Sequence, residues 1–304
     1  MVSNDKGNKE RELWNLLLEQ KGSERGQTLF TLSLLAFENG QHKKSLALAK
    51  SACECFISSF DESEQANCQT SIAFNLKQIG KTEEAIQFLL KAVTGYSNMR
   101  DSQEWEYRMY LADWFREEEY FELSLMQVNL CLEYFRDENS SFEIANTICY
   151  VASLLCEQGK CSDSIEKLQE ARAIYKREKN PALVGAIDIE LSKCFNHLED
   201  GVNAQTFALK ALGVFDSINN EGKKAQVYAQ LGKALNTMGE YQKALEYLNL
   251  AHVLVTGHAP INFYDLYTIQ ESKISAMSAL GRIEEANALH RSNSIINETL
   301  QWVK

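Results

Sequence analysis

YAQLGKALNTMGEYQKALEYLNLAH, residues 228–252, is the stretch of sequence that decides the fold. Small residues recur in it at Gly232, Gly239, Ala244 and Ala251, and leucines stand between them. Apolar residues three or four apart on both sides of a central glycine indicate two amphipathic helices joined by a tight turn. Antiparallel helices approach closely only where a contact ridge lacks bulk. The spacing therefore predicts a helix hairpin.

The same small-residue pattern recurs along the whole chain, at intervals of about 40 residues. The position of Gly232 is taken in successive repeats by Ser33, Ala73, Ala112, Ala152, Ser192, Gly232 and Ile274. That of Ala244 is taken by Ser45, Ala85, Ser124, Ser164, Ala204, Ala244 and Ala286, and that of Ala251 by Ala52, Ala92, Cys131, Ala171, Ala211, Ala251 and Asn293. The chain has only two prolines and no sustained alternation of apolar and polar residues. We therefore expect an all-α protein of seven helix hairpins.

The turn inside the predicted hairpin carries a glycine in five repeats, namely Gly40, Gly80, Gly159, Gly239 and Gly281. A glycine after a helix end adopts the left-handed conformation without strain. Glu119 and Glu199 replace it in the third and fifth repeats. Two geometries stay open for the fifth turn, one with Glu199 at the left-handed position and one displaced by a residue or two toward Gly201.

The repeats LGKALNTMGEYQKALEYLNLA (231–251) and IAFNLKQIGKTEEAIQFLLKA (72–92) resemble tetratricopeptide repeats. The usual period of that family is 34 residues. The longer period here resembles the variety found in Gram-positive peptide-pheromone receptors, kinesin light chains and the adaptor proteins of spindle orientation. This resemblance implies a right-handed superhelical solenoid whose concave inner wall is made by the first helix of each hairpin and holds a protein or peptide. The repeats are expected to start near residues 26, 66, 105, 145, 185, 225 and 267, so that the solenoid covers residues 26–304.

Residues 1–25 are expected to form an N-terminal extension with a capping helix. In ERELWNLLLEQ, residues 10–20, an apolar stripe is made by Leu13, Leu16 and Leu17, flanked by Trp14 and Leu18. Such a helix would cover the open core face of the first repeat. The extension is too short for the DNA-binding or helical-bundle effector domain that pheromone receptors usually carry, so their transcriptional and phosphatase outputs are not expected.

The seventh repeat departs from the pattern at Lys273, Ile274 and Asn293, where apolar or small residues stand in the other repeats. We interpret it as the C-terminal cap, with the ring of Trp302 over the end of the core.

Side chains of the first helices are expected to line the inner wall at three positions in each repeat. The candidate binding residues at these positions are Tyr110, Asp113, Arg116, Tyr150, Glu190, Lys193, Asn196, Gln230, Lys233 and Asn236.

Lys193-x-x-Asn196 and Lys233-x-x-Asn236 repeat one constellation on two successive inner helices. An asparagine amide can donate to one backbone group of an extended peptide and accept from another, and lysine suits a carboxylate. A solvated helix surface shared by descent stays open as the other explanation. The lysines and asparagines occupy different columns from those of the chaperone-binding carboxylate-clamp members, so a C-terminal EEVD-type ligand is not expected.

An apolar patch is predicted on the first two inner helices. It contains Leu34, Phe37 and Phe74, with Phe30 one turn back on the same stripe. Two explanations stay open, since the patch could contact a partner or could be covered by the N-terminal helix with Trp14.

Composition excludes several classes of function. With 31 basic and 42 acidic side chains the net charge is -11, which repels a phosphate backbone, so nucleic acid is not an expected partner. The eight cysteines lack metal-site spacing, and no metal or cofactor is expected. The sequence has no signal peptide and no apolar run of membrane-spanning length, which favours a cytoplasmic location without a membrane partner.

Catalytic motifs are absent from the sequence, which contains no HExxH, GxSxG, GxGxxG or Walker-type glycine loop. Cys194 and His197 lie three residues apart, but nothing near them in sequence forms an oxyanion site. We therefore expect no enzyme. The sequence predicts a non-catalytic adaptor or scaffold that binds a protein or peptide, alone or inside a larger assembly. The alternative is a receptor for a short signalling peptide.

Overall fold

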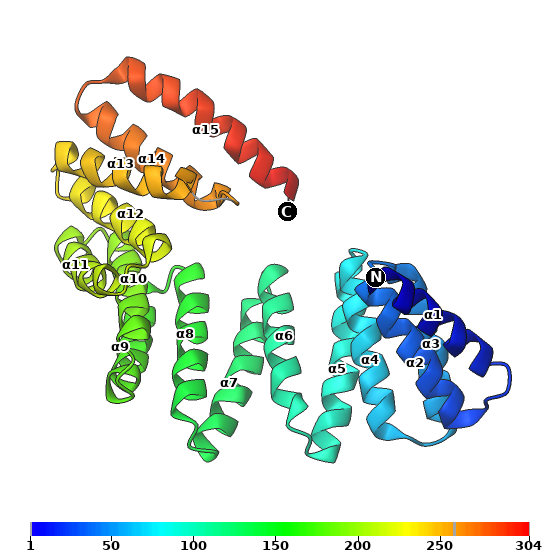
Figure 1. Ribbon diagram of the computed structural model, residues 1–304. Helices are drawn as coiled ribbons and strands as arrows, with labels where there is room; N and C mark the ends of the chain where they lie inside the picture. The colour runs from blue at the N-terminus through cyan, green and yellow to red at the C-terminus, as the bar shows by residue number, and fades with distance from the viewer. Residues whose placement is uncertain (1, 258–259, 304) are drawn as a thin grey trace. The chain divides into compact units, whose positions relative to one another are not determined.

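The computed structural model describes residues 2–257 and 260–303, with side chains described for residues 8–257 and 260–300. These residues form helices and no strands (Figure 1). The helices are α1 (Val2–Leu16), α2 (Gly22–Glu38), α3 (His42–Ser58), α4 (Glu62–Gln78), α5 (Thr82–Met99), α6 (Gln103–Glu117), α7 (Phe121–Asp137), α8 (Ser141–Glu157), α9 (Cys161–Arg177), α10 (Pro181–His197), α11 (Gly201–Ser217), α12 (Glu221–Thr237), α13 (Tyr241–Gly257), α14 (Phe263–Ala279) and α15 (Ile283–Val303). The hairpins α2–α3 to α14–α15 confirm the predicted all-α solenoid of helix pairs.

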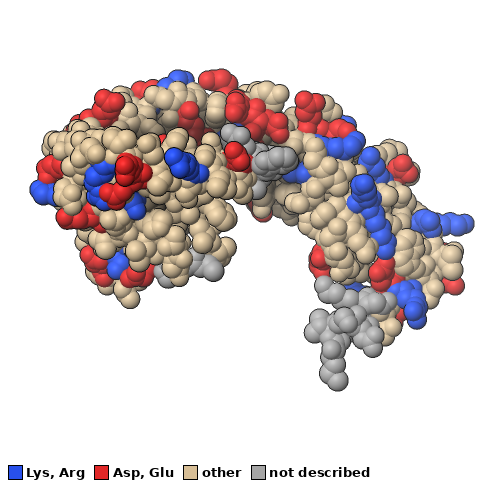
Figure 2. Space-filling view, turned by 90° about the horizontal axis from the view of Figure 1, so that it is seen from above, with Lys and Arg blue, Asp and Glu red and all other residues tan. Residues whose placement is uncertain are grey.

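The chain divides into two compact units, residues 1–131 and 132–304, and the division falls inside α7. Within each unit the helices pack mainly against their neighbours in the chain, as in a solenoid. None of the described helices is long and apolar enough to cross a bilayer. On the face shown in Figure 2, basic and acidic side chains are interspersed instead of being gathered by sign.

Several of the first helices start at a capping residue that precedes the small-residue register. The first helices begin at residues 22, 62, 103, 141, 181, 221 and 263, a few residues before the starts expected from the sequence. Asp61, Asn180 and Asn220 each accept a hydrogen bond from the backbone N–H three residues on. Such a cap satisfies one of the free N–H groups of the first turn. The helices therefore extend beyond the part of each repeat that makes the close contact.

The small-residue columns face one another across each hairpin. A Cβ atom at Gly232 would lie 2.4 Å from Cγ of Leu248, so this position has no room for a side chain. Where a buried serine stands in one of these columns, its hydroxyl forms a hydrogen bond across the close helix contact. Ser192 Oγ donates to the carbonyl of Ala204 at 2.8 Å, and Ser164 Oγ donates to that of Ala152 at 2.7 Å. A serine in either column is therefore small enough to pack and also has its hydroxyl satisfied.

The turns of all seven hairpins share one backbone conformation. Gly239 has a φ of 78°, and Glu119 and Glu199 also take positive values of 62° and 57°. The N–H of the next residue bonds back across the helix end, as from Asp200 to the carbonyl of Phe195 at 2.9 Å. The fifth turn is therefore not displaced toward Gly201, because Asp200 caps α11 and leaves Glu199 at the left-handed position.

The N-terminal helix α1 covers the first hairpin with fewer residues than its apolar stripe suggested. Leu17 is buried and Leu13 packs against the same core, whereas Leu16 and Leu18 are exposed. Glu10 of α1 forms an ion pair with Lys44 of α3 at 2.6 Å.

At the other end, Asn293 lies buried in the last hairpin, where the other repeats have a smaller residue. Its Nδ2 donates to the carboxylate of Glu271 at 2.6 Å and to the carbonyl of Tyr267 at 3.4 Å. The side chain of Trp302, predicted to cover this end of the core, lies outside the described residues.

Candidate functional site

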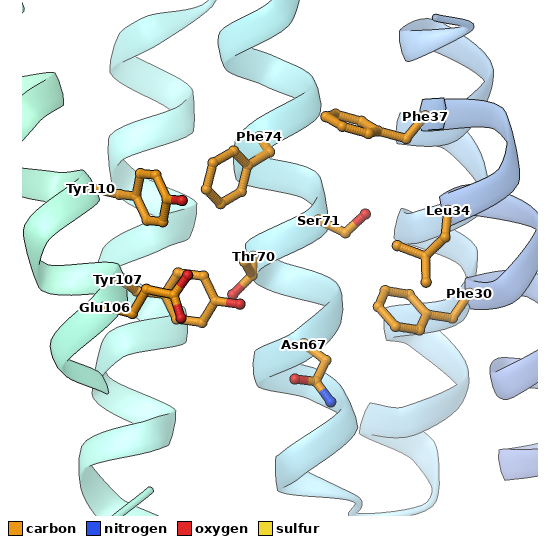
Figure 3. A pocket seen from close by; sticks show the side chains of 10 residues that line it. All are labelled: Phe30, Leu34, Phe37, Asn67, Thr70, Ser71, Phe74, Glu106, Tyr107 and Tyr110. Atoms are coloured by element: carbon orange, nitrogen blue, oxygen red, sulfur yellow. The ribbon is translucent and has the colours of Figure 1, made fainter. Parts of the chain in front are cut away.

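An aromatic pocket of about 490 Å³ lies within the first compact unit. Its lining comes from the first helices α2, α4 and α6 and consists of Phe30, Leu34, Phe37, Asn67, Thr70, Ser71, Phe74, Glu106, Tyr107 and Tyr110 (Figure 3). The 40-residue repeat places Phe30, Thr70 and Tyr110 in one column and Leu34 and Phe74 in another. Successive repeats therefore supply the same face to one shared pocket.

Ring contacts hold the aromatic side of this pocket in place. Phe74 meets Tyr110 edge to face with ring centroids 5.1 Å apart, and it meets Trp114 in the same way at 5.3 Å. Tyr107 stacks on the buried ring of Tyr96 at 5.2 Å. Such pairs add to the energy of area burial and restrict ring orientation. The α6 side of the pocket is therefore ordered before any ligand arrives.

Polar groups beneath the rings are satisfied within the fold. The Tyr96 hydroxyl donates to Oδ1 of Asn67 at 2.8 Å and lies 3.4 Å from Oγ1 of Thr70. Burial raises the pKa of Tyr107, and the nearby Glu106 carboxylate adds to this rise. The phenol is therefore neutral at physiological pH. The pocket offers a largely apolar surface with one exposed carboxylate, that of Glu106, at its edge.

The described residues bear on the two explanations that the sequence left open for the apolar patch. Phe30, Leu34, Phe37 and Phe74 line the pocket, and none of residues 8–16, the part of α1 whose side chains are described, does. Trp14 lies instead near Lys44 of α3, whose Nζ is 6.0 Å from its ring. The described part of α1 therefore packs on the first hairpin away from the patch, and Leu34 is 44% exposed.

Sequence reasoning missed four residues of the aromatic pocket, namely Asn67, Thr70, Glu106 and Tyr107. Each lies three or four residues before an expected inner-wall position, which is one helical turn. A signal for them existed, because extending every inner-wall stripe by one turn toward the helix start would have included all four.

A second, polar pocket of about 220 Å³ lies within the second compact unit. Its lining comes from α10, α12 and α14 and consists of Lys193, Asn196, His197, Gln230, Lys233, Tyr264, Asp265 and Thr268. Four residues predicted from the sequence, Lys193, Asn196, Gln230 and Lys233, are thus brought together. Lys193 and Lys233, which the repeat predicts, supply the positive charge of the pocket. Asp265 of α14 was not among the residues predicted from the sequence.

The charges in the polar pocket interact. Burial lowers the pKa of Lys233, and the nearby Lys193 lowers it further. Burial also lowers the pKa of His197, with the same two lysines adding to the effect, so its imidazole is neutral at pH 7. Burial raises the pKa of Asp265, and the surrounding lysines partly oppose this rise. Lys193 pairs with Glu190 at 2.7 Å, whereas Lys233 forms no ion pair with any residue that the structure describes.

The two asparagines make hydrogen bonds inside the stack that the sequence did not predict. Asn196 Nδ2 donates to the backbone carbonyl of Gln230 at 3.1 Å and to its side-chain oxygen at 3.0 Å. Asn236 Nδ2 donates to the carbonyl of Ser272 at 2.8 Å. Both amides therefore join one first helix to the next, with two hydrogen bonds from Asn196 and one from Asn236. Substituting them is expected to weaken the stack as well as any ligand contact.

The remaining candidates lie outside the two pocket linings. Asp113 and Arg116 follow Tyr110 on α6, Tyr150 lies on α8, and Glu190 is the ion-pair partner of Lys193. Of the two aromatic candidates, Tyr110 lines the aromatic pocket and Tyr150 lines neither of the two pockets.

Cys194 and His197, three residues apart in sequence, have different surroundings. Cys194 Sγ lies 3.9 Å from Cys156 Sγ and 3.4 Å from Ser164 Oγ, whereas His197 lines the polar pocket. Among the described residues no group of three or more histidine, cysteine or acidic side chains is arranged to hold a metal ion.

Comparison with known proteins gives one sequence match and several similar folds. The model of the tetratricopeptide repeat matches residues 225–251, which belong to α12 and α13. No curated protein sequence matches the chain significantly.

Three of the similar solved structures are Rap-type or phosphatase proteins. The apo form of RapI is 14% identical over 91% of this chain and 98% of its own, with a TM-score of 0.62. Aspartyl phosphate phosphatase F from Bacillus subtilis is 15% identical over 95% and 88%, with a TM-score of 0.63. The Rap conjugation gene regulator of the plasmid pLS20, in complex with the Phr* peptide, is 12% identical over 90% and 75%, with a TM-score of 0.54. At these identities the likeness concerns the fold alone. The chain thus has the fold of the tetratricopeptide-repeat proteins, and its sixth hairpin carries the sequence pattern of that family.

Proposed function

We propose that the protein is a non-catalytic scaffold that binds an extended segment of a partner protein on its first helices. The observation that carries this proposal is the aromatic pocket, where three successive repeats surround about 490 Å³ with partly exposed apolar side chains. A pocket of this size and lining suits one or two bulky apolar side chains of a peptide. The rings of Phe74 and Tyr107 are held by neighbours, so little side-chain entropy is lost on binding.

The polar pocket supports a second contact of different chemistry. Lys233 is half-buried, lies near a second lysine and has no ion-pair partner among the described side chains. A buried cation without a partner is costly, and a carboxylate entering the pocket would offset that cost. We propose that this pocket receives an acidic side chain or a free C-terminus, with Lys193 and Lys233 as its partners and Asp265 limiting the number of negative charges that it accepts.

The aromatic pocket is tested by removing two exposed side chains that contribute little to the core. Leu34 and Tyr110 are 44% and 38% exposed. Apolar peptides selected on the wild-type protein from a random-peptide library are expected to bind the Leu34→Ser, Tyr110→Ser variant at least about tenfold more weakly, because about 1.4 kcal/mol of apolar contact is lost. Fluorescence anisotropy with the labelled peptides measures the change.

Leu209→Ser on α11 is the matched control, since Leu209 is 46% exposed and lies outside the pocket. Equal affinity of both variants for the selected peptides would rule out the aromatic pocket as the binding site.

The polar pocket is tested with pairs of peptides that differ only in a free or amidated C-terminus. The wild-type protein is expected to bind the peptide with the free carboxylate more tightly. Lys233→Met is expected to reduce the ratio of the two affinities about tenfold, since a charge-assisted hydrogen bond is lost. Lys243→Met is the control because this lysine lies on α13 and pairs with Glu240. The acid-binding assignment fails if Lys233→Met leaves the ratio of the two affinities unchanged.

A receptor for a short signalling peptide is the alternative function. It is favoured by the similarity in fold to the pLS20 Rap regulator, which was solved with the Phr* peptide. A stable protein partner found by co-purification and mass spectrometry would support the scaffold. Tight binding of free short peptides, together with compaction in X-ray scattering, would support the receptor.

A further inference from the structure

Three cysteine thiols meet inside the second compact unit. Cys156 lies in the last turn of α8, Cys161 is the first residue of α9, and Cys194 lies near the end of α10. Cys156 Sγ is 3.9 Å from Cys161 Sγ and 3.9 Å from Cys194 Sγ. We call these three residues the thiol cluster. All eight cysteines of the chain are free, and among the described residues only these three have sulfur atoms in mutual contact.

Cys156 is the central member of the thiol cluster and the one that solvent reaches. Its side chain is half-buried, whereas Cys161 and Cys194 are 5% and 2% exposed. The Ser164 hydroxyl donates to the carbonyl of Ala152, so it can only accept from the Cys194 thiol 3.4 Å away. The Cys194 sulfur is therefore held between Ser164 and Cys156.

The positions of the three residues connect three helices. Cys156 and Cys161 stand on the two sides of the turn inside the α8–α9 hairpin, and Gly159 in that turn adopts the left-handed conformation. Cys156 and Cys194 stand on neighbouring first helices, α8 and α10. A sulfur–sulfur bond is about 2.05 Å long, so either bond needs the two sulfur atoms to approach by about 2 Å, which is within reach of side-chain rotation.

We propose that Cys156 is an oxidation site for hydroperoxides and that Cys161 or Cys194 resolves the oxidised sulfur into a disulfide. In the first step the Cys156 thiolate attacks one peroxide oxygen, an S–O bond forms, the O–O bond breaks and hydroxide leaves. In the second step the neighbouring thiol loses its proton and attacks the sulfenic sulfur, an S–S bond forms and the hydroxyl leaves as water. Two thiols are oxidised, and one hydrogen peroxide is reduced to two water molecules.

The consequence depends on which thiol resolves Cys156. A bond to Cys161 closes the turn of one hairpin, whereas a bond to Cys194 ties α10 to α8. Because α10 also carries Lys193, Asn196 and His197 of the polar pocket, the second bond would restrict the helix that supplies three of the pocket residues.

Reaction at neutral pH is expected to be slow. Contact with the Cys194 sulfur and burial both raise the pKa of Cys156, and burial raises the pKa of Cys161. The contact with Cys156 lowers the pKa of Cys194, but Cys194 is only 2% exposed, so few thiolates are within reach of peroxide. The protein therefore needs to be exposed to peroxide for hours and not seconds.

The test uses the full-length protein in its folded state and hydrogen peroxide as the probe. After exposure, the remaining thiols are alkylated under denaturing conditions, and the protein is digested with trypsin without reduction. Cleavage after Lys160 and Lys193 places the three cysteines in separate peptides. Mass spectrometry is expected to find the Cys156 peptide joined to that of Cys161 or Cys194, and dithiothreitol is expected to release it.

Matched variants separate the thiol cluster from general oxidation. Cys149 lies on the same helix as Cys156 and is also half-buried, but it makes no sulfur contact. Cys149→Ser is expected to keep the cross-linked peptides, and Cys156→Ser is expected to abolish them. The proposal is overturned if wild-type Cys156 is recovered alkylated or as sulfinic acid without a cross-link, a result that does not depend on the folding of any variant.

Discussion

Gly232→Ala is expected to destabilise the protein by about 2 kcal/mol, although alanine is the better helix former, because a side chain at this position overpacks the hairpin. The new Cβ would lie 2.4 Å from Cγ and 2.6 Å from Cδ2 of Leu248. Leu248 is fully buried, so it has no open space into which it can move. Gly232→Val should lower the free energy of unfolding further, because valine is larger than alanine. Urea unfolding followed by far-UV circular dichroism measures the shift of the transition midpoint.

Gly213 offers a matched control for this experiment. It also lies inside a helix, α11, but no atom lies within 4 Å of a Cβ built there. Gly213→Ala is therefore expected to stabilise the protein by about 0.5–1 kcal/mol through helix propensity alone. The double variant Gly232→Ala, Leu248→Ala should recover part of the packing strain. If Gly232→Ala unfolds at the same urea concentration as Gly213→Ala, the close contact assigned to the small-residue column is wrong.

Arg172→Met is expected to cost about 3 kcal/mol or more, because it leaves a buried carboxylate without its partner. Arg172 on α9 donates from Nε to Oδ1 of Asp188 at 2.6 Å and from Nη2 to Oδ2 at 3.1 Å. Asp188 on α10 is 1% exposed. This pair joins the fourth hairpin to the fifth, so its loss should weaken the packing of these two hairpins against each other. The measurement is again the urea midpoint, together with protease sensitivity of the α9–α10 connection.

Two further variants separate charge burial from the loss of an ion pair as such. In Arg172→Met, Asp188→Leu both charges are removed, and most of the stability should return because apolar residues replace a buried pair at little cost. Arg282→Met breaks a pair of similar two-bond geometry, with 2.7 Å from Nε and Nη2 to the Glu285 carboxylate, but at the exposed surface. Arg282→Met should therefore change the free energy of unfolding little. Equal destabilisation by Arg172→Met and Arg282→Met would contradict the argument from burial.

The periodic part of the fold could be predicted from the sequence because each repeat is a local structure. Ser192 and Ala204 are twelve residues apart and meet across one turn, so the spacing of the small residues alone indicates a hairpin. The geometry of the turn at Glu199 stayed open because a glutamate, unlike a glycine, does not by itself indicate the left-handed conformation. The surrounding helices impose it, as the capping of α11 by Asp200 shows.

The candidate sites were predicted only in part, since they depend on contacts between repeats. The repeated lysines were visible at a spacing of 40 residues, and Lys193 and Lys233 indeed line one pocket. The N–H groups of Asn196 were assigned to a ligand, yet they bond to Gln230 of the next first helix. Sequence spacing shows which side chains lie on the same face of a helix. It does not show whether a carbonyl of a neighbouring helix already accepts a hydrogen bond from one of them.

The sequence by itself determined the all-α class, the seven hairpins and the small residues at their close contacts, because these depend on separations of a few to a dozen residues. Tertiary structure alone decided that Phe30, Phe74 and Tyr110 share an open pocket and that Cys156 meets Cys194. These residues are about 40 to 80 positions apart in sequence. Their side chains come within contact distance only after separate helices have stacked, and the stacking depends on packing and not on local conformational preference.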